Sequence, residues 1–195
     1  LYGQDQPADI PLFSGLSAQD VTDYLVRNQQ VLLEKIKSQP RFSRDIAMLP
    51  MMPQLRTTCH IDGDYTLVQE DAYRHFEDSV CAINDFDHRD YLYEVPLRCL
   101  VKAGYPNLIT AGRSASASGY GWDILRVIPP AILTGQAAGE ACALAIETET
   151  QIDRVPIRTL QQRLEQAHVM IHSPDDLVPQ AAHTADQSDQ NVPVQ

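Results

Sequence analysis

Two stretches of the chain carry apolar residues at helical spacing. Residues 18–37 follow Ser17, whose side chain is a common helix N-cap. Residues 157–167 place Leu160 and Leu164 on one face. We therefore predict amphipathic helices over both ranges. The apolar stripe of the first helix is formed by Val21, Leu25, Leu32 and Ile36.

A third helical stretch, residues 131–146, is apolar on nearly every face, and this pattern predicts burial. The pair Pro129-Pro130 is tolerated only in the first turn of a helix, so the helix begins close to this pair. Its free backbone N–H groups are then expected near Arg126, Val127 and Ile128. Together with the helix dipole, such groups form an anion-binding site.

Shorter apolar runs predict strands. Residues 54–61 and 65–68 flank Asp62-Gly63-Asp64, and Asp-Gly between two such runs is a hairpin signal. Residues 91–95 also favour a strand. Residues 71–83 are ambiguous, and we assign them to a helix.

Small residues dominate the segment that precedes the apolar helix. A short apolar run, residues 108–110, predicts a buried strand, and Ala111-Gly112 after it allows a sharp turn or the close approach of a ligand. A loop rich in Ser, Ala and Gly follows over residues 114–121. The whole pattern predicts an α/β or α+β fold, with a mixed sheet covered by helices. From Ser173 onward the chain is polar and contains prolines, so we expect disorder.

Composition narrows the classes of partner. With 195 residues and 44% hydrophobic content, the chain can bury one substantial core. Its net charge of −11 disfavours nucleic acid and anionic membranes, because phosphate groups would be repelled. No apolar stretch reaches the roughly twenty residues that span a bilayer. We therefore expect a soluble protein with no nucleic-acid or membrane partner; its compartment stays open, with the cytoplasm favoured.

The order of several motifs resembles the C-terminal part of FAD-dependent oxidoreductases that share a glutathione-reductase-type FAD-binding domain. Pro96-Leu-Arg-Cys-Leu100 resembles a Pro-x-Arg-x-Leu segment of that family, and Asn107-Leu-Ile-Thr-Ala-Gly-Arg113 resembles its strand end. Gly135-Gln-Ala-Ala-Gly139 resembles its small-residue helix. Further back, Arg56 to Tyr65 resembles the family's arginine-containing strand and turn. The resemblance covers roughly residues 42–171.

This resemblance implies that the complete protein is an oxidoreductase that binds FAD. The ribityl and pyrophosphate groups would lie near Gly112, Arg113 and Ser114, and the pyrimidine edge of the flavin over Arg126, Val127 and Ile128. A small-molecule substrate would give hydride to flavin N5. Neither the catalytic residue nor the substrate can be named from the sequence.

The sequence contains no Gly-x-Gly-x-x-Gly, the motif that binds the ADP part of FAD in such enzymes. We therefore interpret the chain as a C-terminal fragment whose N-terminal FAD-binding half is missing, so that FAD is bound weakly or not at all by the fragment alone. Residues 1–100 would be a partial substrate or cap region, residues 101–172 the C-terminal part of the FAD-binding domain, and residues 173–195 a disordered tail.

Two side chains are candidates for the substrate. Arg56 could bind a substrate carboxylate or hydroxyl, although an ion pair within the domain is an equal alternative. His88 could face the substrate if its acidic loop, with Asp85 and Asp87, borders the flavin. No metal site is expected, because a turn explains His60, Asp62 and Asp64 better and a solvated loop explains the Asp85–His88 group. The four cysteines show no Cys-x-x-Cys pair and are predicted to be buried thiols: Cys59, Cys81, Cys99 and Cys142.

Two other classes of function stay open. Gly112-Arg-Ser-Ala-Ser116 is similar to a nucleophile elbow, with Asp153 and His168 downstream in hydrolase order, but a glycine is needed where Ser116 stands. The stronger alternative is a flavin-free remnant, or an interaction module without catalytic activity of its own. A purified protein that stays colourless after FAD is added would favour that alternative.

Overall fold

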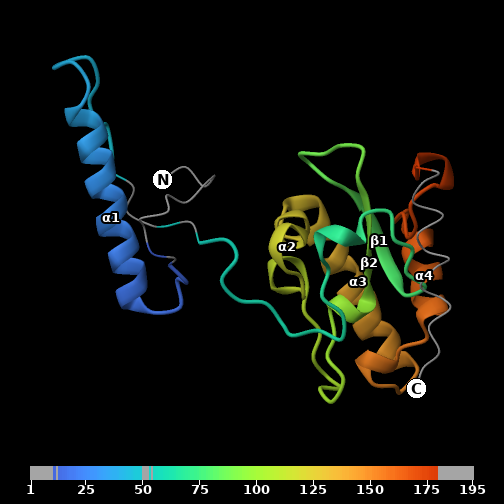
Figure 1. The fold of residues 1–195 in the computed structure, drawn as a ribbon. Coiled ribbons are helices and arrows are strands. Elements are labelled where there is room, and N and C mark those ends of the chain that lie inside the picture. Colours follow the sequence, from blue (N-terminus) through green and yellow to red (C-terminus); the bar gives the residue numbers. More distant parts are fainter. Residues whose placement is uncertain (1–10, 12, 50–52, 54, 180–195) are drawn as a thin grey trace, which may run out of the picture. The chain divides into compact units, whose positions relative to one another are not determined.

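The computed structural model describes residues 11, 13–49, 53 and 55–179 (Figure 1). The chain divides into two compact units, Leu1–Thr58 and Cys59–Gln195, and each is described by itself. The boundary at residues 58 and 59 reflects contacts between backbone segments, not function. The predicted functional division at residues 100 and 172 stays a prediction.

The first unit is built around helix α1, Ala18–Lys37, which confirms the predicted helix. Its N-cap is Ser17, whose hydroxyl accepts a hydrogen bond of 3.1 Å from the backbone N–H of Asp20. Lys35 and Lys37 lie in the last turn, where the helix dipole favours positive charge. Local capping and charge thus account for the bounds of this helix.

The second unit contains a two-stranded antiparallel sheet, in which β1, Ser79–Asn84, pairs with β2, Leu92–Pro96. The predicted strand over residues 91–95 is confirmed with a shift of one residue. The predicted helix over residues 71–83 is wrong, because its second half is β1 and residues 69–71 form only a 3₁₀ turn. Side chains on both faces of β1 are buried, so the strand lacks the alternation that identifies a strand in sequence.

The predicted hairpin over residues 54–68 is also wrong, with Gln54 lying outside the described residues. The backbone N–H groups of this segment bind carbonyls far along the chain: Ile61 to Ser114 at 2.8 Å and Leu67 to Ser116 at 3.1 Å. A Cβ on Gly63 would lie 2.8 Å from the carbonyl oxygen of Arg98. This glycine therefore permits a close approach of two segments instead of a turn.

Helix α3, Ile128–Glu147, has Val127 as its N-cap and prolines in its first turn, as predicted. One side of it packs on the sheet, but Ile128, Ile132 and Ile146 are exposed, so the prediction of burial on every face is wrong. The structure adds a short helix that the sequence did not predict, α2, Gly119–Leu125.

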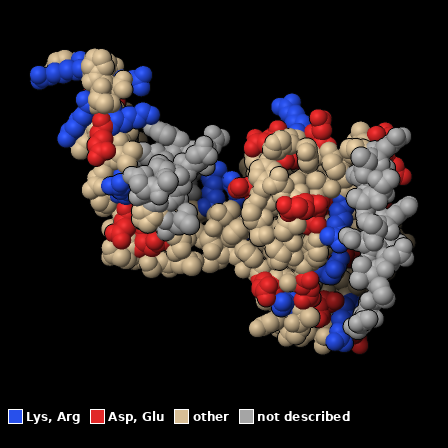
Figure 2. Space-filling view, in the orientation of Figure 1, with Lys and Arg blue, Asp and Glu red and all other residues tan. Residues whose placement is uncertain are grey.

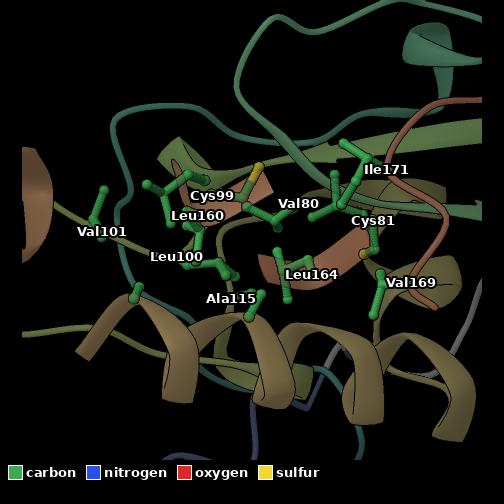
Figure 3. Packing of buried hydrophobic residues seen from close by; sticks show 14 of the residues in the cluster. Val80, Cys81, Cys99, Leu100, Val101, Ala115, Leu160, Leu164, Val169 and Ile171 are labelled. Carbon is green, nitrogen blue, oxygen red and sulfur yellow. The ribbon is translucent and has the colours of Figure 1, made fainter. Parts of the chain in front are cut away.

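The core lies where α3 meets β1 and α4, Ile157–Gln166 (Figure 3). Helix α4 confirms the predicted second amphipathic helix and ends one residue earlier. Leu160 and Leu164 are fully buried, and burial of each contributes about 1.5–3 kcal/mol. Small residues on the inner side of α3 let the helix approach this layer: Ala137, Ala141 and Ala145.

Three further predictions are changed in detail. Residues 108–110 form no full strand in the described structure but a single antiparallel bridge between Val101 and Ile109, and Leu108 is exposed. Cys81 and Cys99 are buried as expected, whereas Cys59 is exposed and Cys142 half-buried. The predicted disorder from residue 173 falls partly on residues 180–195, which lie outside the described residues; residues 175–177 form a 3₁₀ turn.

Charged side chains of both signs are interspersed on the face of the second unit drawn in Figure 2. Among the described helices, none combines the length and apolar character that crossing a membrane requires.

Candidate functional site

Gly112 begins a 3₁₀ turn, Gly112–Ser114, that packs on the first turns of α3. Its backbone N–H donates a 2.9 Å hydrogen bond to Oγ1 of Thr134, and that hydroxyl donates to the carbonyl of Pro130 at 2.7 Å. Gly112 has φ +62°, and an added Cβ would lie 3.3 Å from the Cβ of Ala131. The close approach that the sequence indicates at Gly112 is therefore made, at least in part, to α3 itself.

The start of α3 presents two backbone donors. Within the described part of the chain, neither the N–H of Val127 nor that of Ile128 has a hydrogen-bond partner. Pro129 and Pro130 have no N–H, and the next donor, Ala131, binds the carbonyl of Val127 at 3.1 Å.

The prediction that free donors extend to Arg126 is wrong in detail, because its N–H binds the carbonyl of Trp122 at 3.1 Å as the C-cap of α2. The side chain of Arg126 lies beside the start of α3, with its Nε 2.6 Å from Oδ1 of Asp123. The guanidinium is thus fixed at this end of the helix, and its charge is largely balanced by Asp123.

The side chain of Arg113 is exposed, while its backbone carbonyl accepts a 2.8 Å hydrogen bond from the indole N–H of Trp122. Ser114 donates from its hydroxyl to the carbonyl of Ala111 at 3.1 Å. The residue after it, Ala115, is extended, so no helix directly follows this serine as a nucleophile elbow requires. The hydrolase alternative therefore loses its structural basis.

His88 belongs to a cluster around a buried carboxylate. Its Nδ1 lies 3.2 Å from Oδ2 of Asp85 and 3.3 Å from the hydroxyl of Tyr120. Oδ1 of Asp85 accepts hydrogen bonds from Tyr120 at 2.9 Å and from the N–H of Asp87 at 2.8 Å.

The cluster changes the acidity of Asp85 and of Tyr120. Burial opposes ionisation of Asp85, but donors from Asp87, His88 and Tyr120 outweigh it and lower the pKa of this carboxyl. Burial and the neighbouring Asp85 raise the pKa of Tyr120. At neutral pH the cluster therefore holds a carboxylate that accepts from a protonated phenol.

Helix α2 joins these features, because Tyr120 contacts the His88 loop, Trp122 contacts the Gly112–Ser114 turn and Asp123 contacts Arg126. The other predicted site residues lie in the second unit, whereas Arg56 belongs to the first unit. Helix α2 was not predicted from the sequence. The feature that could have indicated it is the pair of aromatic residues Tyr120 and Trp122 on either side of Gly121. A Cβ at Gly121 would lie 2.6 Å from the carbonyl oxygen of Leu67, so this glycine is fixed by packing.

Comparison with known families supports the motif-based resemblance. A sequence model of the family described as FAD dependent oxidoreductase matches residues 16–164, more than half of the chain. Comparisons with curated proteins and with solved structures gave no significant match. On the strength of the family match, the chain belongs to the FAD dependent oxidoreductases.

Proposed function

We propose that the second unit supplies the flavin side of an FAD site, centred on the start of α3. The observation that carries this proposal is the pair of backbone N–H groups at Val127 and Ile128, which have no partner within the described residues. They lie at the positive end of a 20-residue helix, where negative charge is favoured by about 0.3–1 kcal/mol at exposed sites.

The surrounding residues fit the flavin end of FAD. The pyrimidine edge of a flavin carries hydrogen-bond acceptors and gains negative charge on reduction, so it needs donors and no nearby carboxylate left unbalanced. Val127 and Ile128 offer backbone donors, Arg113 offers an exposed guanidinium, and Asp123 is neutralised by Arg126. The Gly112–Ser114 turn packs on the same end of the helix and would hold the ribityl chain.

Bound FAD would supply the redox chemistry by accepting a hydride at N5 from a small-molecule substrate. The residues of this chain would orient the flavin, stabilise charge at its edge and form part of the substrate wall. His88 is the substrate-facing candidate in that wall, because its imidazole is exposed and is oriented by Asp85 and Tyr120. We infer that the ADP half of FAD is bound by polypeptide that carries the glycine-rich fingerprint, since these 195 residues contain none.

A matched pair of variants tests the donor role. Ile128→Pro removes one N–H, and the backbone tolerates it because proline suits the first helical position and Val127 is already extended, with ψ 166°. Ile128→Ala removes the exposed side chain and keeps the N–H. In the natural full-length protein we expect Ile128→Pro to bind oxidised FAD about 2–10-fold more weakly than Ile128→Ala, because a hydrogen bond to a neutral acceptor contributes about 0.5–1.5 kcal/mol.

Equal flavin affinity in the two variants would contradict the placement of the flavin at this helix start. A natural full-length protein that stays colourless with added FAD would instead favour the flavin-free remnant or interaction module.

A further inference from the structure

A second cluster of ionisable side chains surrounds Glu94, a residue of β2. Oε2 of Glu94 is 3.4 Å from Nδ1 of His75 and 3.0 Å from Nδ1 of His172. The two imidazole rings are 4.5 Å apart between centroids. All three potential ligand atoms lie within 4.8 Å of one another.

Glu94 is the anchor of this cluster and is almost fully buried, with its side chain 4% exposed. Backbone N–H groups fix both of its oxygens, Phe76 donating to Oε2 at 2.8 Å and Ser173 to Oε1 at 3.0 Å. Among the described residues, no Lys or Arg forms an ion pair with it. A buried carboxylate requires a compensating charge, and here the groups available to it are two imidazoles.

The spacing matches the needs of a transition-metal ion. Zinc binds imidazole nitrogen and carboxylate oxygen at about 2.0–2.2 Å, so two ligand atoms of a tetrahedral site lie about 3.3 Å apart. The distances from Glu94 Oε2 to the imidazole nitrogens, 3.4 Å for His75 and 3.0 Å for His172, are close to this value; the shorter one is a hydrogen bond that a bound ion would replace. Two histidines and one carboxylate are a common ligand set for divalent transition metals.

Outer groups support the same arrangement. The second nitrogen of His75, Nε2, lies 3.7 Å from Oε1 of Glu77, just beyond hydrogen-bond distance, and a carboxylate near the far nitrogen is a common way of orienting a metal-binding histidine. The hydroxyl oxygen of Ser173, the residue after His172, is buried and has no hydrogen-bond partner within the described structure.

We propose that His75, Glu94 and His172 bind a divalent transition-metal ion, with zinc the best fit. The three ligands come from the turn before β1, from β2 and from the segment after α4, so the ion would fasten the C-terminal segment to the sheet. This site is independent of the proposed flavin function. The sequence predicted no metal site. It could not reveal this one, because the three ligands are too far apart along the chain to form a motif.

Cobalt(II) provides a direct test with the 195-residue chain, freed of metal by a chelator. We expect visible d–d absorption that saturates at a single cobalt ion per chain and disappears when zinc is added. We also expect zinc to raise the melting temperature, because a ligand that binds only the folded state stabilises it.

Variants identify the ligands. His75→Gln and His172→Gln should each weaken cobalt binding by more than about a hundredfold, because altering outer-shell groups alone costs 10–100-fold. His75 is about half exposed, so its variant should keep the wild-type circular dichroism spectrum. The matched control is His60→Gln, an exposed histidine outside the cluster, which should bind cobalt like the wild type.

Failure of cobalt to bind the wild-type chain would overturn the proposal. Equal cobalt affinity in the wild type, His75→Gln and His172→Gln would overturn it as well, because the ion would then be bound by other residues.

Discussion

At the scale of single residues, glycine and aspartate carry the most structural information in this chain. Gly112 combines a backbone conformation that favours glycine with a close contact to α3, whereas the sequence predicted a sharp turn or the close approach of a ligand. Sequence identifies such a glycine because few other residues adopt positive φ. It does not identify what the glycine approaches, since Thr134 and Ala131 lie about twenty residues further along the chain.

Replacing Gly112 by alanine should lower the free energy of unfolding by about 1–3 kcal/mol, because a non-glycine residue in this region of φ is strained. Gly104 is the matched control, since it has φ +87° and nothing within 4 Å of an added Cβ. Both variants carry the strain of a positive φ, so the additional loss that chemical denaturation should show for Gly112→Ala over Gly104→Ala reports the 3.3 Å contact with Ala131. Equal losses would mean that the contact with Ala131 contributes nothing.

The Asp85 cluster predicts a pH-dependent stability. Because the pKa of Asp85 is lowered in the folded state, its ionised form stabilises the fold above the unfolded pKa of about 3.9, and this contribution is lost as pH falls through the folded pKa. The Asp85→Asn variant should therefore have a free energy of unfolding about 1.5–3 kcal/mol lower than that of the wild type at neutral pH. Urea denaturation should show the difference shrinking below about pH 4. A difference that is constant with pH would contradict this role of the carboxylate.

At the scale of elements, local signals predicted helices well and strands poorly. The start of α1 was readable from Ser17, and the start of α3 from its two prolines, because caps and first turns depend on adjacent residues. The segment around Gly63 was read as a hairpin, yet its hydrogen bonds go to residues near 98–117. Pairing between distant segments leaves no local pattern, so this connection could not be read from sequence, whereas β1 was missed because side chains on both of its faces are buried.

In the candidate site, too, the sequence predicted features set by neighbouring residues and missed those formed by distant ones. The sequence located the Gly112–Ser114 turn and the free donors at the start of α3. It overlooked α2, whose side chains join the turn, the helix start and the His88 loop. It also overlooked the cluster around Glu94, because its members lie in three separate segments.

At the scale of the whole molecule, the family match spans residues 16–164 and so includes parts of both compact units. Within the second unit, the Gly112–Ser114 turn and α2 both contact α3, and charged side chains of both signs lie on the face drawn in Figure 2. The proposed flavin-binding role of this unit therefore depends on whether the start of α3 contacts the flavin.

Hydrogen exchange resolved to single amides, in the natural full-length protein with and without FAD, tests this most directly. The N–H groups of Val127 and Ile128 should exchange rapidly without FAD and become protected when it binds. The N–H groups of Gly112 and Arg126, already bonded to Thr134 and Trp122, serve as internal references and should change less. Exchange at Val127 and Ile128 that is unaffected by bound FAD would contradict the central claim.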